Sequence, residues 1–413
     1  MTIKRIRLSL EQGAALIAGL LALTALPGDL AAQSSAEVVE QSLVAREQRG
    51  EEGAPLWSLD QRMQHYGIPG FAMAVIDNGQ IAHVQGYGVV QSGCLQRVDQ
   101  DTVFSAGSVS KVVNAALILR LVADGQLDLD EDVNRYLKRW KVPDNDFTAQ
   151  RKVTLRMILA HTAGFNQHGF PDFLPGEELP TILETLEGQG PAKHDAIRVE
   201  AVPGSAMRYS GGGVTVAQLV VEDVTGLSYD EAARRYVFAP LGMNRSSFAS
   251  PLPEDYGNVA MAHDEDGLPV ALPRGWHSFP EVAASGLWTS ANDLALFVVA
   301  LMESHAGREA FLPQHLAEQM MERATNSWHG LGPRINGTGA KHIFHHGGSN
   351  DSYRSRIEGH LGSGQGIVLL TNGARGAWLN SEVRKAVEQE YDWAVKIEED
   401  YDFVELNAGV SMP

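Results

Sequence analysis

The sequence predicts an α+β fold, in which strands from both ends of the chain form one antiparallel sheet and a largely helical segment is inserted between them. Two apolar stretches early in the 413-residue chain, 71–76 and 81–89, flank a tight-turn sequence and predict a β-hairpin. Between about 108 and 330 the apolar residues follow mostly helical spacing with long loops. Strand patterns return near the end of the chain, at 343–346, 353–361 and 366–371.

The first elements have clear boundaries. Ser58 is a good N-cap for a short helix that runs to Tyr66, and Gly67 ends this helix. The hairpin turn at 77–80 contains an Asn-Gly pair, which suits a turn whose two central residues need positive φ. We therefore expect a helix and then a hairpin at the start of the sheet.

Two longer helices are predicted beyond the hairpin. The first is strongly apolar, runs over about 108–124 and is closed by Gly125. The second covers about 376–395. One of its faces is apolar and consists of Leu379, Val383, Ala386, Val387 and Ala394.

The N-terminus, 1–32, is typical of a secretion signal. Three basic residues precede an apolar stretch at 13–26, and small residues around Ala32 offer a cleavage site. The stretch is short for a bilayer span. We therefore expect an exported protein, periplasmic or secreted, with no stable membrane span after signal cleavage; a retained N-terminal anchor is the alternative.

The rest of the chain divides into three parts. Residues 33–55 are polar and end in Gly and Pro, which suits a linker or a peripheral helix. Residues 56–395 carry all the predicted sheet and helix patterns and form one folded domain. Residues 396–413 are rich in Asp and Glu and are expected to be a solvated acidic tail.

Composition excludes several classes of function. The chain has 51 acidic and 33 basic residues, a formal charge of −18, which argues against a nucleic-acid partner. The single cysteine, Cys94, rules out a disulfide framework within the chain and a multi-cysteine metal site. His342, His345 and His346 lie close together, but adjacent strand residues point to opposite faces and no acidic partner is near. We therefore expect no metal and no cofactor.

The pair Ser108 and Lys111 carries the predicted chemistry. A serine at the start of a helix has backbone N–H groups around it, and the lysine three residues later lies on the same face. A serine hydroxyl needs a base to become a nucleophile, and burial of a lysine favours its neutral, proton-accepting form. Ser105 and Ser110 are rival serines, but only Ser108 has a lysine at this spacing.

Ser108–Lys111 and several short motifs that follow it occur in an order that resembles the serine β-lactamase and penicillin-binding protein superfamily, closest to its class C-like branch. That branch includes class C β-lactamases, D-Ala-D-Ala carboxypeptidases, D-amino-acid-specific peptidases and esterases. The resemblance covers about 56–395. These short motifs are His161-Thr162-Ala163-Gly164, Tyr209-Ser210-Gly211, Val224-Thr225-Gly226, Pro240-Leu241-Gly242-Met243, Gly286-Leu287-Trp288-Thr289-Ser290 and His346-Gly347-Gly348.

The resemblance implies a β-lactamase/transpeptidase-like fold and a role for each matching residue. Ser108 would be the acylated nucleophile, Lys111 its proton acceptor or the residue that tunes it, and Tyr209 a proton shuttle between the nucleophile and the leaving group. A phenol acts as a base only where cations stabilise its phenolate. His161 is expected to order a loop rather than to take part in the chemistry.

The resemblance also implies the substrate-binding wall. The strand His346-Gly347-Gly348 would line the pocket. The backbone N–H of the next residue, Ser349, would pair with that of Ser108 as an oxyanion hole.

The chain departs from the family at position 211, where Gly replaces the Asn of the Tyr-x-Asn motif. That Asn would hydrogen-bond the lysine and the substrate amide, so Gly211 argues against efficient lactam or peptide turnover. We expect an acyl-enzyme hydrolase that acts on small esters or on D-configured, peptidoglycan-like amides. The alternatives are a D,D-carboxypeptidase or weak β-lactamase, and a non-catalytic penicillin-binding or structural relative.

Overall fold

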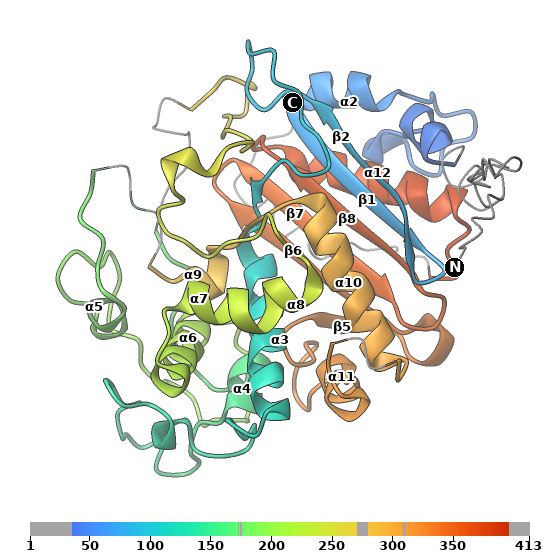
Figure 1. Cartoon of the computed structure of the whole chain (residues 1–413). Helices are drawn as coiled ribbons and strands as arrows, with labels where there is room; N and C mark the ends of the chain where they lie inside the picture. The colour runs from blue at the N-terminus through green and yellow to red at the C-terminus, as the bar shows by residue number, and fades with distance from the viewer. Residues whose placement is uncertain (1–34, 172, 174–175, 271–279, 309–310, 396–413) are drawn as a thin grey trace, which may run out of the picture.

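The protein is built on a six-stranded antiparallel sheet whose strands come from both ends of the chain (Figure 1). The computed structural model describes residues 35–171, 173, 176–270, 280–308 and 311–395. The strand order is β2-β1-β8-β7-β6-β5, and a two-stranded ribbon pairs β3 with β4. The strands are β1 (Gly70–Asp77), β2 (Gln80–Gly88), β3 (Phe104–Ser105), β4 (Trp288–Thr289), β5 (Arg334–Asn336), β6 (Ile343–Asn350), β7 (Tyr353–His360) and β8 (Gln365–Thr371).

The helices cover both faces of this sheet. They are α2 (Leu59–Tyr66), α3 (Ser110–Ala123), α4 (Leu155–Leu159), α5 (Ile182–Glu187), α6 (Gly211–Thr225), α7 (Tyr229–Ala233), α8 (Ala239–Leu241), α9 (Val282–Ser285), α10 (Ala291–His305), α11 (Gln314–Met321) and α12 (Gly376–Glu390). α2 and α12 lie on one face, α10 crosses the other, and the remaining helices extend from the α10 side (Figure 1). The α+β prediction with a helical insertion is confirmed.

Strand β1 shows why both faces are filled. Its residues alternate between two cores, because successive strand side chains point to opposite faces. Ala72 and Ala74 belong to the core shared with the helical insertion, and small side chains there let α10 pack closely. Phe71 and Met73 belong to the core under α2 and α12.

The local signals at the start of the chain gave the right elements. Asn78 and Gly79 have φ of 51° and 73°, as the Asn-Gly turn requires. Ser58 caps α2 by accepting the Gln61 N–H, and Gly67 ends it in the left-handed conformation. Within the 33–55 segment, 35–41 is helical. Leu43 is fully buried in the core beneath α2, so this segment is a peripheral element packed on the domain.

The last helix is shorter than predicted. It ends at Glu390, and the chain then turns through Asp392 at a φ of 45°. This turn buries the Trp393 indole completely, whereas Ala394, expected on the apolar face, is exposed. The predicted end at 395 was wrong because burial of a large indole outweighs another turn of helix.

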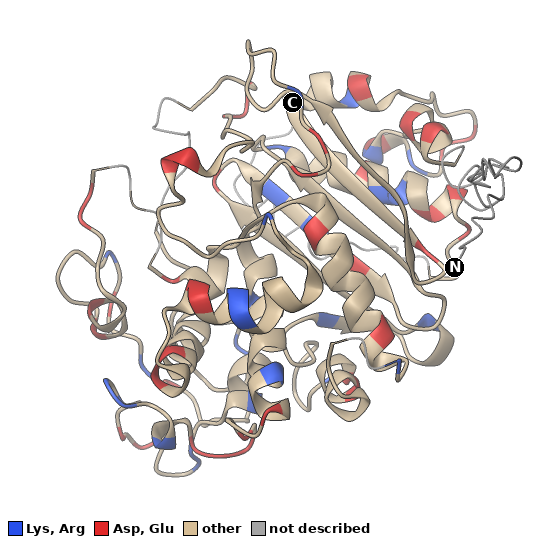
Figure 2. Ribbon diagram, viewed as in Figure 1, with Lys and Arg blue, Asp and Glu red and all other residues tan. Residues whose placement is uncertain are grey.

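Charged residues lie on the strands of the sheet as well as on the surface (Figure 2). Glu358 on β7 is fully buried and accepts hydrogen bonds from Arg384 on α12 and from Arg356. Burial disfavours the carboxylate, but the charges of Arg384 and Arg356 outweigh it and hold the pKa of Glu358 well below its ordinary value. This cluster ties α12 to the sheet.

Two expectations concern the chain ends. The proposed signal at 1–32 and the acidic tail at 396–413 lie outside the described residues. In the part of the chain that is described, no helix has the length and apolarity needed to span a bilayer.

Candidate active site

A cavity of about 290 Å³ lies between strand β6 and the helical insertion. It brings together residues that are far apart in the sequence. All but one of the predicted site residues line it: Ser108, Lys111, Tyr209, Gly211, His346, Gly347 and Ser349. The exception, Gly348, packs against the nucleophile loop, because a Cβ there would lie 2.0 Å from the Ala106 carbonyl oxygen.

Ser108 lies in a 3-10 turn, η2 (Gly107–Val109), that leads directly into α3. The Lys111 Nζ lies 3.1 Å from the Ser108 Oγ and donates a 2.7 Å hydrogen bond to the Ala284 carbonyl of α9. Lys111 is only 3% exposed, so its amine is largely shielded from water. The carbonyl of α9 therefore fixes the lysine nitrogen against the serine hydroxyl.

The rival serines are occupied by structural bonds. The Ser110 hydroxyl is fully buried, donates to the Gly107 carbonyl and accepts the Leu287 N–H. The Ser105 hydroxyl accepts a hydrogen bond from Asn350 Nδ2. None of these three hydrogen bonds involves a lysine.

The backbone of β6 comes unusually close to the nucleophile turn. Gly107 has a φ of 51°, and a Cβ built on it would lie 2.5 Å from the Ser349 nitrogen. Only glycine combines this conformation with this approach. The contact places the Ser349 backbone beside Ser108 on one wall of the cavity.

Tyr209 lies opposite the nucleophile, in a ring of histidines. Its ring centroid is 5.0 Å from the Lys111 Nζ. The centroids of four imidazoles lie around it, at 4.3, 4.9, 5.9 and 6.3 Å for His161, His168, His329 and His346. His168 and His329 were not predicted, because they lie on loops without a recognisable motif and only the fold brings them to Tyr209.

Burial lowers the pKa of His161 well below its ordinary value, and the nearby His329, Lys111 and His346 lower it further. His161 is therefore a neutral imidazole.

Gly211 opens α6, and its backbone lies outside the left-handed region. The space beside Gly211 is filled by neighbouring residues: a Cβ at this position would lie 3.0 Å from both the His168 carbonyl oxygen and the Phe170 ring. Phe170 is half-buried, lines the cavity, and was not identified from the sequence. The side of the cavity that an Asn amide would occupy is thus an aromatic wall.

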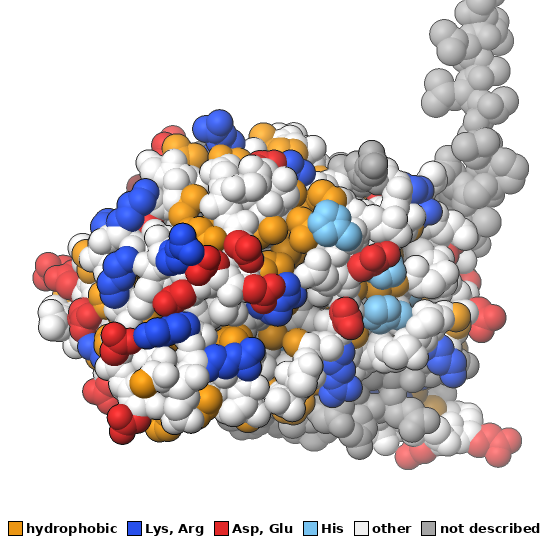
Figure 3. Space-filling model, turned by 90° about the horizontal axis from the view of Figure 1, so that it is seen from below, with side chains coloured by type: hydrophobic (Ala, Val, Ile, Leu, Met, Phe, Trp, Pro, Cys, Tyr) orange, Lys and Arg blue, Asp and Glu red, His pale blue; other side chains and the backbone are white. Residues whose placement is uncertain are grey.

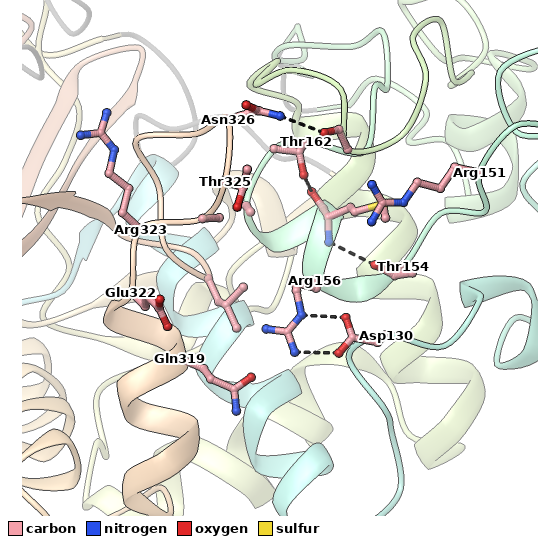
Figure 4. A pocket seen from close by; sticks show the side chains of 15 residues that line it. Asp130, Arg151, Thr154, Arg156, Thr162, Gln319, Glu322, Arg323, Thr325 and Asn326 are labelled. Carbon is pink, nitrogen blue, oxygen red and sulfur yellow. Dashed lines mark hydrogen bonds and ion pairs between the residues drawn. The ribbon is translucent and has the colours of Figure 1, made fainter.

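A larger hollow, of about 480 Å³, lies at the α4 and α11 end of the molecule (Figure 4). Its charges are mixed: Asp130 binds Arg156 through two 2.7 Å hydrogen bonds, and Glu322 lies on the same wall as Arg323. Basic and acidic side chains are likewise interspersed over the face in Figure 3. The residues lining this hollow include no serine, cysteine, lysine or histidine, so it lacks the nucleophile–base pair of the smaller cavity.

Among the residues that the structure describes, no group of three His, Cys, Asp or Glu is arranged to hold a metal ion. His345 and His346 point to opposite sides of β6: His345 lies by Asn336, and His346 faces the cavity. The cavity itself holds a serine hydroxyl beside a buried amine.

Comparisons with known proteins concern the family and the fold of the chain. Penicillin-binding protein 4 of Amycolatopsis lactamdurans is 33% identical over 52% of this chain and 55% of its own length, so the match spans little more than half of that relative. Esterase EstB of Burkholderia gladioli is 27% identical over 68% of this chain and 75% of its own length. The octameric penicillin-binding protein homologue from Pyrococcus abyssi has the same fold, with a TM-score of 0.65 at 22% identity over 80% of this chain and 75% of its own. A family model, Beta-lactamase, matches residues 58–390. The chain belongs to the Beta-lactamase family of serine hydrolases and penicillin-binding proteins.

Proposed function

We propose that this protein is an exported serine hydrolase that forms an acyl-enzyme on Ser108 and prefers small esters. The observation that carries the proposal is the 3.1 Å approach of the Lys111 amine to the Ser108 hydroxyl inside a cavity that Tyr209 and His346 also line. A nucleophile and a base within hydrogen-bond reach, with the base oriented by a third group, is the arrangement that nucleophilic catalysis needs. Here the third group is the Ala284 carbonyl.

The proposed reaction has two halves. In the first, neutral Lys111 takes the proton from Ser108, and the Oγ attacks the ester carbonyl carbon. The negative charge passes to the carbonyl oxygen, which the N–H groups of Ser108 and Ser349 stabilise. The proton then reaches the departing alkoxide through Tyr209. In the second half, water attacks the acyl-enzyme by the same route and frees the acid.

The preference for esters rests on Gly211 and Phe170. Amides are poor leaving groups, so their acylation depends on polar groups that align the carbonyl and protonate the nitrogen. Position 211 supplies no such group, and Phe170 fills the space beside it with an apolar ring. Similarity to an esterase, EstB, fits this preference. We also expect D-configured, peptidoglycan-like amides to be hydrolysed, but more slowly than esters. An exported enzyme would meet such amides outside the cytoplasm.

A second candidate is a penicillin-binding protein that acylates without turnover. Similarity to penicillin-binding protein 4 over half of this chain favours it. The same Ser108 would react, but deacylation would be slow.

One experiment separates these functions. Purified protein is given a p-nitrophenyl ester, a chromogenic lactam and a fluorescent penicillin, with Ser108→Ala and the surface variant Ser363→Ala as a matched pair. We expect ester turnover that is lost in Ser108→Ala and kept in Ser363→Ala, with any covalent adduct on the Ser108 peptide by mass spectrometry. Penicillin labelling without turnover indicates the second candidate. Full activity in Ser108→Ala, or an adduct on Ser105 or Ser110, rules out the proposed nucleophile.

A further inference from the structure

His161 has an unusual backbone for a buried residue. It follows α4 with a φ of 57° and is 2% exposed. A non-glycine side chain in the left-handed region costs free energy and persists only where the surroundings fix it. His161 lies next to Tyr209 and near Lys111, so the contacts that hold this conformation also bear on the candidate active site.

Two hydrogen bonds join His161 to the residues on either side of Tyr209. The Arg208 N–H donates to the His161 carbonyl oxygen at 2.7 Å. The Ser210 N–H donates to the His161 Nδ1 at 3.2 Å. One residue therefore holds the backbone just before and just after the tyrosine.

The imidazole of His161 also supports the Tyr209 ring directly. The two ring centroids are 4.3 Å apart and the ring planes are inclined by 35°. Because Nδ1 accepts the Ser210 N–H, the ring proton of the neutral imidazole is on Nε2. The left-handed backbone is what lets the carbonyl and the ring of one residue reach both sides of Tyr209.

We propose that His161 is the positioning residue for Tyr209: it holds the flanking backbone and packs on the ring, so that the phenol ring keeps its place beside the Lys111 amine. The inference rests on the proposed function, because it concerns the proton path of that reaction. A displacement of about 1 Å in a reacting group costs on the order of 100-fold in rate. Loosening Tyr209 should therefore lower kcat more than it changes KM.

The test is His161→Asn, because asparagine tolerates the left-handed backbone and keeps the carbonyl that accepts the Arg208 N–H. We expect a fall in kcat for the p-nitrophenyl ester of roughly 10- to 100-fold, with KM within about threefold. Amide hydrogen exchange at Ser210 should change little, because the Asn Oδ1 is bonded to Cγ as the His Nδ1 is and can still accept the Ser210 N–H. What His161→Asn removes is the rest of the ring that packs on Tyr209. His263→Asn is the matched control: it also removes a fully buried histidine that binds backbone groups, but those groups belong to Ser92 and Asn372 rather than to the residues beside Tyr209.

Coupling to Tyr209 separates positioning from general destabilisation. In a Tyr209→Phe background, His161→Asn should lower kcat by less than about threefold, because residues that act as a unit are not additive. His161→Gln places its amide oxygen one bond beyond the Nδ1 position, so it should also loosen the Ser210 N–H, speed its exchange and lower kcat at least as much as His161→Asn. It serves if His161→Asn does not fold. An unchanged kcat in His161→Asn, or a full loss that multiplies with Tyr209→Phe, overturns the role of His161.

Failure of the proposed function would look different. In that case wild-type protein would neither hydrolyse the ester nor be labelled by penicillin on Ser108, and the role of His161 in the reaction would fall with it. A normal wild-type rate with an unaffected His161→Asn variant would overturn the inference alone.

Discussion

The substitution Gly211→Asn supplies the amide that a Tyr-x-Asn motif would have at this position, and the structure predicts that it will not act alone. The new Cβ would lie 3.0 Å from the His168 carbonyl oxygen and from the Phe170 ring, tighter than an ordinary carbon contact. The helical backbone at 211 is not the obstacle, because it lies outside the left-handed region. The obstacle is the segment packed against it.

The size of each effect follows from these contacts. Overpacking of this kind costs about 1–3 kcal/mol, so Gly211→Asn should be less stable than wild type by that amount. A buried hydrogen bond to a substrate amide is worth about 1–3 kcal/mol, which corresponds to roughly 10- to 100-fold in rate. The single substitution should therefore change the lactam-to-ester ratio of kcat/KM by less than about threefold. Phe170→Ala added to it should make room and raise the ratio by roughly 10- to 100-fold.

The assay measures kcat/KM for a chromogenic lactam and a p-nitrophenyl ester, together with unfolding by urea, in wild type and variants. Gly211→Ala with Phe170→Ala is the matched control, since it makes the same contacts at Cβ but has no amide. The control should leave the ratio near that of Phe170→Ala alone. The reasoning is refuted if Gly211→Asn with Phe170 intact is as stable as wild type and already raises the ratio, or if the asparagine double variant matches the alanine control.

Three further predictions concern the catalytic unit and the fold. Lys111→Ala and Tyr209→Phe should each lower ester kcat/KM by about 10²–10⁴-fold in steady-state kinetics. The double variant should lose little more than either single variant, because the two residues act as a unit. Losses that multiply fully would mean that the two residues have independent roles. Glu358→Gln should be about 3–5 kcal/mol less stable than wild type at pH 7, because it removes the buried carboxylate charge that both Arg356 and Arg384 bind. The pKa of Glu358 is lower in the folded protein than in the unfolded chain. Its stabilising effect is therefore complete above the ordinary carboxyl pKa of about 4.3 and is lost as the pH falls through the folded pKa. Unfolding by urea at a series of acid pH values should show the difference in stability between wild type and Glu358→Gln becoming smaller. Glu382→Ala should destabilise by a similar ~3–5 kcal/mol, measured by urea unfolding, since it strips the buried Arg62 of its bidentate partner.

The elements that the sequence predicted correctly are those whose causes are local. The Asn78-Gly79 turn and the Ser58 cap act within four residues, so their spacing alone determines the structure. The end of α12 is decided by Trp393, whose burial depends on the sheet and on α2. The short edge strand β5 (Arg334–Asn336) forms only because β6 is there to pair with it. Neither cause is visible in a window of sequence.

The site divides in the same way. The ordered sequence motifs predicted Ser108, Lys111 and Tyr209 as site residues, and the fold brings all three to one cavity. Phe170 and His168 lie on a loop without a motif, and only the fold carries that loop to Gly211. The sequence could show that an amide was missing at 211, but not what had taken its place.

Glycines on the two sides of the cavity permit contacts of different closeness. At Gly107 and Gly348 a Cβ would lie 2.5 and 2.0 Å from backbone atoms, so no side chain fits without moving β6 away from the nucleophile turn. At Gly211 the nearest atoms are 3.0 Å away, and one of them belongs to a half-buried ring that can turn. Backbone packed against backbone has no such freedom. The glycine contacts beside the serine are therefore fixed by the fold, whereas the side of the cavity at Gly211 can be remodelled once Phe170 is changed with it. We expect substrate preference to respond to this pair of positions without disturbance of Ser108.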